Sequence, residues 1–216
     1  MKRVLFVILL LTAFNSFAQQ GKSDPEAKKI LEQVSAKYKS YKTMTAPFTF
    51  KVEDATGKTR ETQSGTLYIK AARYKVNLGS SVMYSDGKSV WAFDKEINEV
   101  QITHFDPDEN TITPQKMFSD FYDKDFLYKL NEDVKVGNRV LQEVELTPKD
   151  KTHMYFKILL HLDKSTKEIV SFKIFEKNGN RYTYTIKDLK ANTPIADAFF
   201  IFSAKDHPGV EVVDLR

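Results

Sequence analysis

The sequence of 216 residues contains no cysteine. Disulfide bonds, thiolate zinc sites, iron–sulfur clusters, cysteine nucleophiles and a lipid-anchoring cysteine are therefore excluded. Tryptophan is nearly absent too, and no stretch after the first eighteen positions reaches the roughly 18 apolar residues of a membrane-spanning helix. The folded chain must therefore be held together by noncovalent packing alone.

Charge of one sign is not concentrated anywhere in the chain. The 33 lysines and arginines are interspersed with 29 acidic residues, and the formal net charge is only +4. No basic block of the kind that binds nucleic acid is present, so we predict no nucleic-acid partner. Aromatic residues are abundant instead, with 16 Phe and 10 Tyr. The length suits a single globular domain.

The first residues have the pattern of an export signal. Lys2 and Arg3 precede an apolar run over residues 4–13, and Ser16 and Ala18 are small residues just before Gln19. This three-part pattern is typical of a cleaved secretory signal. The alternative, an uncleaved anchor, is disfavoured because the run is too short to cross a bilayer as a helix. We predict a signal over residues 1–18 and an exported, soluble domain over residues 19–216.

The mature chain is expected to begin with an amphipathic helix. Asp24, Pro25 and Glu26 are typical of a helix N-cap and first turn. Apolar residues then recur at steps of three and four, which predicts about four helical turns with one buried stripe. The stripe consists of Ala27, Ile30, Leu31, Val34, Tyr38 and Tyr41.

From Met44 onward the apolar period changes to two, which indicates strands. Asp86-Gly87 and Asn178-Gly179 are typical hairpin turns. Pro114 opens a second helical segment, which Phe126, Leu127 and Leu130 follow, and the strands resume after Gly137. Eight to eleven antiparallel strands with two helical segments predict a mainly β protein with some α, a large curved sheet or open barrel whose dry face the helices cover.

No catalytic or metal-binding pattern stands out. The four histidines lack ligand spacing, and no nucleophile elbow is present. Gly57-Lys58-Thr59 and Gly87-Lys88-Ser89 lack the first glycine of a phosphate loop. The segment starting at Asp106 lacks the glycine and the glutamate of a calcium loop. We therefore predict a non-enzymatic protein without metal or cofactor.

Several segments, in this order and spacing, resemble one known family. They are Phe48-Thr49-Phe50-Lys51, Gly65-Thr66-Leu67-Tyr68-Ile69-Lys70, Ser85-Asp86-Gly87-Lys88-Ser89-Val90-Trp91, Leu146-Thr147-Pro148-Lys149, Phe199 to Phe202, and Pro208-Gly209-Val210-Glu211-Val212. The family is that of the periplasmic outer-membrane lipoprotein carriers, LolA.

The resemblance implies a fold and a function. The fold is an incomplete, strongly curved antiparallel β-barrel, a half-barrel, covered by a helical lid. The function is to bind the acyl chains of lipoproteins, receive them in the periplasm from an ABC-type exporter of the inner membrane, and pass them to an outer-membrane acceptor. We expect such a shuttle to be a monomer.

The chain departs from the family at one place. An arginine–proline pair, thought to hold the lid closed, usually follows the Gly-x-Leu-x-x-Lys strand. Ala71 and Ala72 stand there instead, so Arg73 is the candidate for a lid-closing residue.

The candidate binding surface consists of alternating apolar strand residues. Ordinary core packing is the alternative for each of them, because alternation defines two faces without saying which one is concave. The second helical segment is expected to supply the lid, through Met117, Phe118 and Phe121. The candidate lining of a hydrophobic cavity is Phe48, Phe50, Leu67, Ile69, Tyr74, Val76, Trp91 and Phe93.

Three other functions remain open at this point. The chain resembles, in part, envelope sensors that bind lipoproteins and signal to a partner. A carrier of another amphiphile, such as a glycolipid or a pigment ester, would need the same apolar cavity. An exported hydrolase is the last alternative, for which the sequence supplies neither a recognisable nucleophile nor a base.

Overall fold

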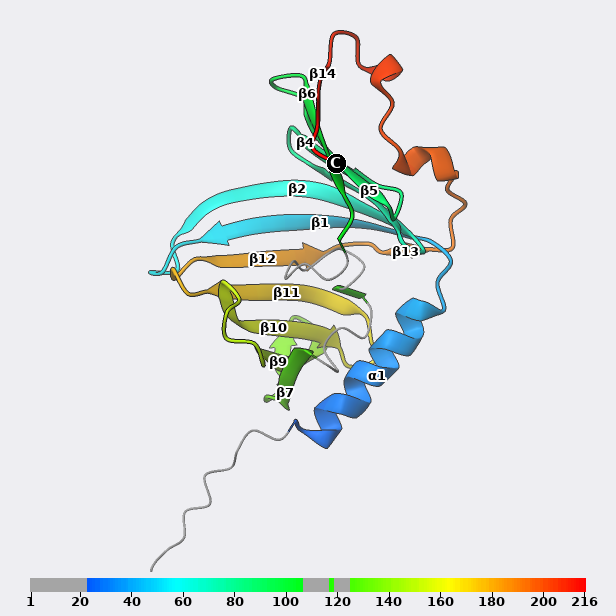
Figure 1. Ribbon diagram of the computed structural model, residues 1–216. Coiled ribbons are helices and arrows are strands. Elements are labelled where there is room, and N and C mark those ends of the chain that lie inside the picture. The colour runs from blue at the N-terminus through cyan, green and yellow to red at the C-terminus, as the bar shows by residue number, and fades with distance from the viewer. Residues whose placement is uncertain (1–22, 107–116, 119–124) are drawn as a thin grey trace, which may run out of the picture.

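The computed structural model describes residues 23–106, 117–118 and 125–216 (Figure 1). The predicted signal, the lid residue Phe121 and most of the second predicted helix lie outside the described residues. The helical elements are α1 (Pro25–Lys39) and the short 3₁₀ turns η1 (Asp197–Phe200) and η2 (Ala204–Asp206). The strands are β1 (Met44–Glu53), β2 (Thr59–Lys70), β3 (Arg73–Leu78), β4 (Ser81–Ser85), β5 (Ser89–Asp94), β6 (Glu99–His104), β7 (Phe126–Leu130), β8 (Val134–Val136), β9 (Arg139–Pro148), β10 (Tyr155–Asp163), β11 (Ile169–Glu176), β12 (Arg181–Ile186), β13 (Lys190–Ala191) and β14 (Glu211–Asp214).

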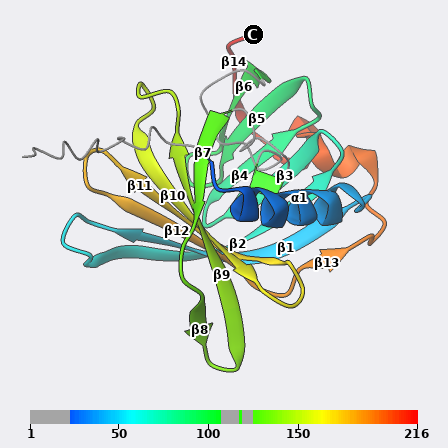
Figure 2. The same cartoon turned by 90° about the horizontal axis from the view of Figure 1, so that it is seen from below.

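The described strands form one sheet. Its order is β14-β6-β5-β4-β3-β2-β1-β12-β11-β10-β9-β7, with β13 against β1 and β8 against β9. Neighbours are antiparallel, except that β14 runs parallel to β6. One meander extends from β1 to β6, and a second returns so that β12 pairs with the other edge of β1. Among the described strands β14 and β7 do not pair with each other, so the curved sheet stays open, as the half-barrel prediction requires (Figure 2).

The helix α1 begins where the sequence predicts it. The Asp24 carboxylate accepts hydrogen bonds from the backbone N–H groups of Glu26 and Ala27, at 2.8 and 3.4 Å. Asp24 also reaches the sheet: its N–H donates to the Tyr128 carbonyl at 2.9 Å, and its carboxylate accepts from the Leu130 N–H at 3.3 Å. The start of α1 is thereby attached to β7.

The apolar stripe of α1 faces the sheet and is buried there. Its members Ala27, Ile30, Leu31, Val34 and Tyr38 pack against strand residues in one large cluster. We call the face that bears these strand residues the inner face, and the opposite side the outer face; Figure 2 shows α1 lying across the inner face. The buried strand residues of the inner face are Met44, Ala46, Phe48, Leu67, Ile69, Tyr74, Phe126, Tyr128, Val144, Leu146, Ile158, Leu160, Leu162, Ile169 and Phe172.

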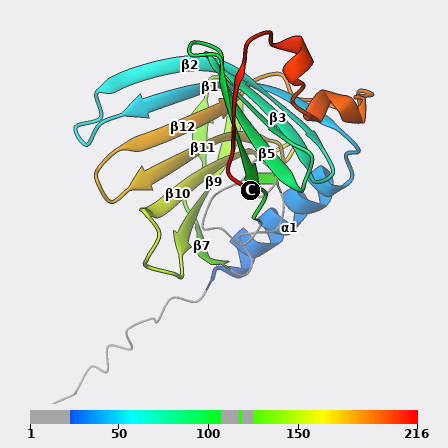
Figure 3. The same ribbon diagram turned by 45° about the horizontal axis from the view of Figure 1, so that its top comes forward.

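A smaller cluster lies on the outer face of β4, β5 and β6. Phe202, from the segment that follows β13, lies with its ring 5.8 Å from Tyr84 and 5.2 Å from Phe93. Val82 and Val100 complete the buried part of this cluster. The segment between β13 and β14, with η1 and η2, therefore covers apolar residues on the side of the sheet away from α1 (Figure 3).

Strand β7 is absent from the sequence prediction, as are the short strands β8, β13 and β14. Phe126 to Leu130 follow a segment with helical spacing, and the sequence indicated no strand there. The structure pairs them with β9 as β7, in the register Tyr128 opposite Leu146. Five residues are too few for a period of two to stand out, and the pairing with β9 provides the stabilisation instead.

Candidate functional site: an apolar inner face

Six of the eight predicted cavity residues lie together on the inner face. In the ladder from β1 to β3, Ala46 is opposite Leu67, which is opposite Val76, and Ile69 is opposite Tyr74. Phe48 and Phe50 share this face because side chains alternate along β1. Phe48, Leu67, Ile69 and Tyr74 are buried, whereas Phe50 and Val76 are half-buried.

Trp91 and Phe93 are not brought to this face. Phe93 pairs with Val82, and Val82 pairs with Asn77, the neighbour of the inward Val76. Phe93 therefore lies on the outer face, where it packs against Phe202, and Trp91 packs against the same outer cluster. The prediction that all eight residues share one surface is wrong for these two. Directly paired residues point to the same face of a sheet, and adjacent residues of one strand point to opposite faces. Phe93 is aligned through Val82 with Asn77, so it lies on the face opposite Val76.

The predicted lid residue Phe118 lies in the inner-face cluster. Its side chain is only 4% exposed, and its ring lies 4.9 Å from Tyr38 and 6.1 Å from Phe172. Met117 is half-buried against the same cluster. Phe118 thus connects the last turn of α1 to β11, over the inner face. Phe121, the third predicted lid residue, lies outside the described residues.

Arg73 makes its ion pair away from Phe118. Its Nη1 lies 3.4 Å from Asp197 Oδ2, and Lys70 Nζ lies 2.7 Å from Asp197 Oδ1. The Lys70 ammonium, assisted by Arg73, lowers the pKa of the Asp197 carboxyl. Since Arg73 precedes the inward Tyr74, its side chain belongs to the outer face. In the described part of the chain, Arg73 therefore ties the C-terminal segment to the sheet.

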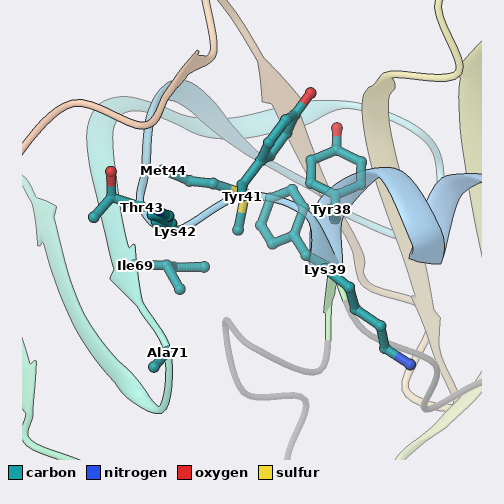
Figure 4. Close-up of a pocket in the computed structure, with 9 residues that line it drawn as sticks. Tyr38, Lys39, Tyr41, Lys42, Thr43, Met44, Ile69 and Ala71 are labelled. Carbon is teal, nitrogen blue, oxygen red and sulfur yellow. The ribbon is translucent and has the colours of Figure 1, made fainter.

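A cavity of about 230 Å³ opens at the end of the inner face that α1 covers (Figure 4). It lies between the end of α1, the start of β1 and the end of β2, and we call this part of the inner face the covered end. Pockets that bury small ligands measure about 300–1,000 Å³, so this space is smaller than a whole acyl chain with its linkage would need. The lining residues are Tyr38, Lys39, Tyr41, Lys42, Thr43, Met44, Ile69, Ala71 and Phe118.

Farther from α1 the inner face carries half-buried aromatic residues, and we call this region the open end. The ring of Phe50 stacks on Tyr182, with centroids 6.1 Å apart, and lies 4.9 Å from Tyr184. Ile174 packs beside them. Burial raises the pKa of the Tyr184 phenol, so its hydroxyl stays neutral and can donate a hydrogen bond at neutral pH.

Sequence reasoning missed the contribution of β12 and β11 to this surface. The alternation of Tyr182, Thr183 and Tyr184 indicated a strand, but no sequence signal showed that this strand would pair with β1. That long-range pairing places Tyr184 opposite Phe50.

A second cavity, of about 640 Å³, lies at the ends of β9 to β12 near the loop before β11. Charged groups dominate its lining, which does not suit an apolar chain. Its lining residues are Arg139, Asp163, Thr166, Glu168, Ile169, Val170, Ile186, Lys187, Asp188 and Leu189.

One row of polar side chains on the outer face has the residue types of a hydrolase triad. His161 Nε2 lies 2.8 Å from Glu143 Oε2, and His161 Nδ1 lies 3.0 Å from Ser171 Oγ. The three residues are direct neighbours across β9, β10 and β11, where the backbone N–H groups form the ladder. Because the backbone N–H groups of these strands bond neighbouring strands, the row has no pair of N–H groups that could stabilise the oxyanion of a hydrolytic reaction. Across the described residues, no group of three or more potential metal ligands occurs.

The family model described as "Outer membrane lipoprotein carrier protein LolA" matches residues 39–203. The chain belongs to the LolA family. A curated relative of this LolA-family chain, the outer-membrane lipoprotein carrier protein of Idiomarina loihiensis, is 26% identical over 210 residues, covering 94% of each chain. The matched region contains the inner-face residues of β1, β2 and β3.

Solved structures share the fold at low sequence identity. An uncharacterized conserved protein from Thermus thermophilus superposes with a TM-score of 0.59 at 14% identity, covering 88% of the LolA-family chain and 99% of its own. The lipoprotein LppX of Mycobacterium tuberculosis gives a TM-score of 0.51 at 9% identity, covering 81% and 99%. Within the described residues of this chain, no helix has the length and apolarity needed to cross a membrane.

Proposed function

We propose that this LolA-family chain is a periplasmic carrier that binds the acyl chains of lipoproteins on its inner face. It would act as a monomer after removal of residues 1–18, receiving lipoproteins from an inner-membrane exporter and delivering them toward the outer membrane. The observation that carries the proposal is the continuous apolar inner face, covered by α1 and Phe118 at one end and half-exposed around Phe50 at the other.

The energetic argument for such a carrier is simple. At about 0.8 kcal/mol for each methylene, leaving a chain of ~15 methylenes in water costs roughly 12 kcal/mol. A lipoprotein therefore needs an apolar surface to cross an aqueous compartment. A carrier must also release its cargo, which favours a surface of aromatic and aliphatic groups without a tight polar clamp or covalent chemistry.

Binding requires the covered end to open. The cavity there measures about 230 Å³, and Tyr38 and Phe118 occupy the space beside it. Near the cavity, polar groups at the last turn of α1 bond the loop before β11 and its first residue: Tyr38 accepts from the Ile169 N–H, and Lys37 donates to Glu168 and to the Thr166 carbonyl. The other end of α1 stays attached to β7 through Asp24. We therefore expect α1 and Phe118 to move away from the strands as an acyl chain enters between them.

The test is native mass spectrometry of residues 19–216, purified gently from the periplasm of the natural host. The proposal expects a one-to-one adduct with a triacylated protein. An adduct with a free glycolipid or pigment ester would replace it by the carriage of another amphiphile. A bare mass, with no uptake of an added acylated peptide, would contradict any carrier role and favour a lipoprotein-sensing interaction module.

Two matched variants test which face of the sheet binds the acyl chain. Phe50→Ser removes a half-buried ring from the inner face, and Phe175→Ser removes one from the outer face of β11. We expect Phe50→Ser to weaken the binding of a fluorescent acylated peptide roughly tenfold or more, while Phe175→Ser leaves it unchanged. Equal effects of both changes would show that the inner face is not the binding surface.

A further inference from the structure

The hairpin between β9 and β10 exposes two large apolar side chains that are two residues apart in the sequence. Met154 is 69% exposed and Phe156 is 48% exposed. A β-bulge explains the second of these: Tyr155 is opposite Glu176 and Lys157 is opposite Phe175, which leaves Phe156 without a partner in register. Tyr155 turns to the inner face, where its ring stacks on Phe126, so Phe156 points to the outer side.

Basic residues surround this apolar pair. Residues 149–157 and 173–181 together contain Lys149, Lys151, Lys157, Lys173, Lys177 and Arg181, but only two acidic residues, Asp150 and Glu176. Neighbouring segments contribute further acidic groups: Glu145 lies 3.9 Å from Lys157, Glu53 lies 2.9 Å from Lys173, and, besides burial, the Asp125 carboxylate helps to raise the pKa of Tyr155. Positive charge therefore remains in excess around Met154 and Phe156.

The two hairpins are held together as one surface. The Lys177 N–H donates to the Met154 carbonyl at 2.9 Å, and Lys177 Nζ donates to the Lys151 carbonyl. On the outer side, the Phe175 ring lies 6.2 Å from Phe156. The Lys157 ammonium lies 4.7 Å from the centre of the same ring. The rings of Phe156 and Phe175 and the Lys157 ammonium thus lie together on one surface that both hairpins form.

From this arrangement we infer that the tip formed by residues 149–157 and 173–181 docks onto the surface of an anionic lipid bilayer. Exposed apolar side chains flanked by lysine and arginine match the two layers of such a surface, since the apolar groups enter the acyl boundary and the cations stay among the phosphates. Two projecting side chains suit shallow, reversible insertion. A stable protein interface buries about 800 Å² on each partner and needs a broader apolar core.

The position of the tip relates membrane docking to the transfer of acyl chains. This part of the inference rests on the proposed carrier function. In Figure 1 the loops β1–β2, β9–β10 and β11–β12 lie at the same end of the sheet. The open end of the inner face, with Phe50 and Tyr182, leads to these loops. A tip resting on a bilayer would bring the open end next to the lipids, so that an acyl chain passes between them with little exposure to water.

The experiment is co-sedimentation of residues 19–216 with vesicles made of equal parts of phosphatidylcholine and phosphatidylglycerol. Vesicles of phosphatidylcholine alone are the comparison. We expect sedimentation with the anionic vesicles, falling about tenfold in the double variant M154S/F156S. The matched control is I97S/V136S, which removes two other exposed apolar side chains, 66% and 56% exposed, from different hairpins.

A spectroscopic readout gives the depth of insertion. Because the chain has no cysteine, Met154→Cys can carry a single environment-sensitive fluorophore. Its emission should shift to shorter wavelength with anionic vesicles, and the same fluorophore at Ile97→Cys should not respond. Wild-type protein that fails to sediment, or M154S/F156S that sediments like wild type, overturns the inference. Capture of a protein at position 154 in the absence of vesicle binding overturns it in favour of a protein partner.

The same variants separate this inference from the proposed function. If M154S/F156S loses vesicle binding but still binds the acylated peptide in solution, the carrier function stands and the tip is a docking device. If wild-type protein binds vesicles but takes up no acylated peptide, the docking stands and the carrier function fails.

Discussion

The hydroxyl of Tyr38 accepts a hydrogen bond from the backbone N–H of Ile169 at 2.9 Å, inside the protein. This bond joins the last turn of α1 to the first residue of β11. Burial raises the pKa of the Tyr38 phenol, so the group stays neutral throughout the physiological range. The same ring lies 4.9 Å from Phe118, so Tyr38 contacts both the sheet and the second covering residue.

Tyr38→Phe should destabilise the protein by about 1–3 kcal/mol, because the buried Ile169 N–H loses its acceptor while the ring remains. Urea unfolding followed by circular dichroism measures the change. Tyr41→Phe, at a half-buried ring next to Tyr38, is the control and should change stability by less than about 0.5 kcal/mol. If opening at Tyr38 limits uptake, Tyr38→Phe should also bind an acylated peptide faster. An unchanged free energy of unfolding would remove Tyr38 as the tie between α1 and β11.

Arg73→Ala should leave acylated-peptide binding unchanged, because its guanidinium pairs with Asp197 on the outer face. The expected effect is on the C-terminal segment: limited proteolysis after β13 should become faster, with little loss of global stability because the pair is exposed. Asp197→Asn should reproduce the result. A large change in peptide binding by Arg73→Ala alone would instead support the lid-closing role that the sequence suggested.

Asp163→Asn should reduce stability at neutral pH by about 1–3 kcal/mol. The Asp163 carboxylate accepts hydrogen bonds from the Ser165 hydroxyl, the Thr166 N–H and Arg139 Nε, and these bonds lower its pKa well below the ordinary value. A carboxyl whose pKa is lowered on folding contributes its stabilisation above the unfolded pKa of about 3.9, and that contribution is lost as pH falls further.

The pH dependence provides the check on this assignment. Unfolding free energies measured by urea titration at neutral pH and near pH 3 should differ less in Asp163→Asn than in wild type. Asp188→Asn, at an exposed residue on the loop after β12, is the matched control and should keep the wild-type pH dependence. The same acid sensitivity in all three proteins would show that Asp163 does not contribute to it.

Gly65→Ala should destabilise the sheet by about 1–3 kcal/mol, because an added Cβ would lie 2.6 Å from the Asn77 carbonyl oxygen and 2.6 Å from the Phe48 ring. Phe48 lies across this glycine from the neighbouring strand. Thr66→Ala, one position along β2 on the outer face, serves as the control. Thermal unfolding compares the two variants, and equal melting temperatures would show that the close approach at Gly65 is not required.

Local chemistry accounts for the elements that the sequence predicted well. The N-cap at Asp24 and the apolar stripe from Ala27 to Tyr38 are properties of neighbouring residues, and the helix they predict is α1. The turns at Gly87 and Gly179 adopt the positive φ that glycine allows. Alternation likewise predicted most strands, although β7, β8, β13 and β14 were too short for a pattern to stand out.

By itself, then, the sequence determined a helix followed by an open antiparallel sheet, the absence of cysteine chemistry, and the resemblance to a lipoprotein carrier. Only the tertiary structure decided which side of each strand is covered. It separated Trp91 and Phe93 from Phe48 and Leu67, and it added Tyr184 to the inner face through the pairing of β12 with β1. The physical reason is that a period of two defines two faces equally well. Pairing between distant strands, together with α1 on one side and Phe202 on the other, determines which face each strand buries.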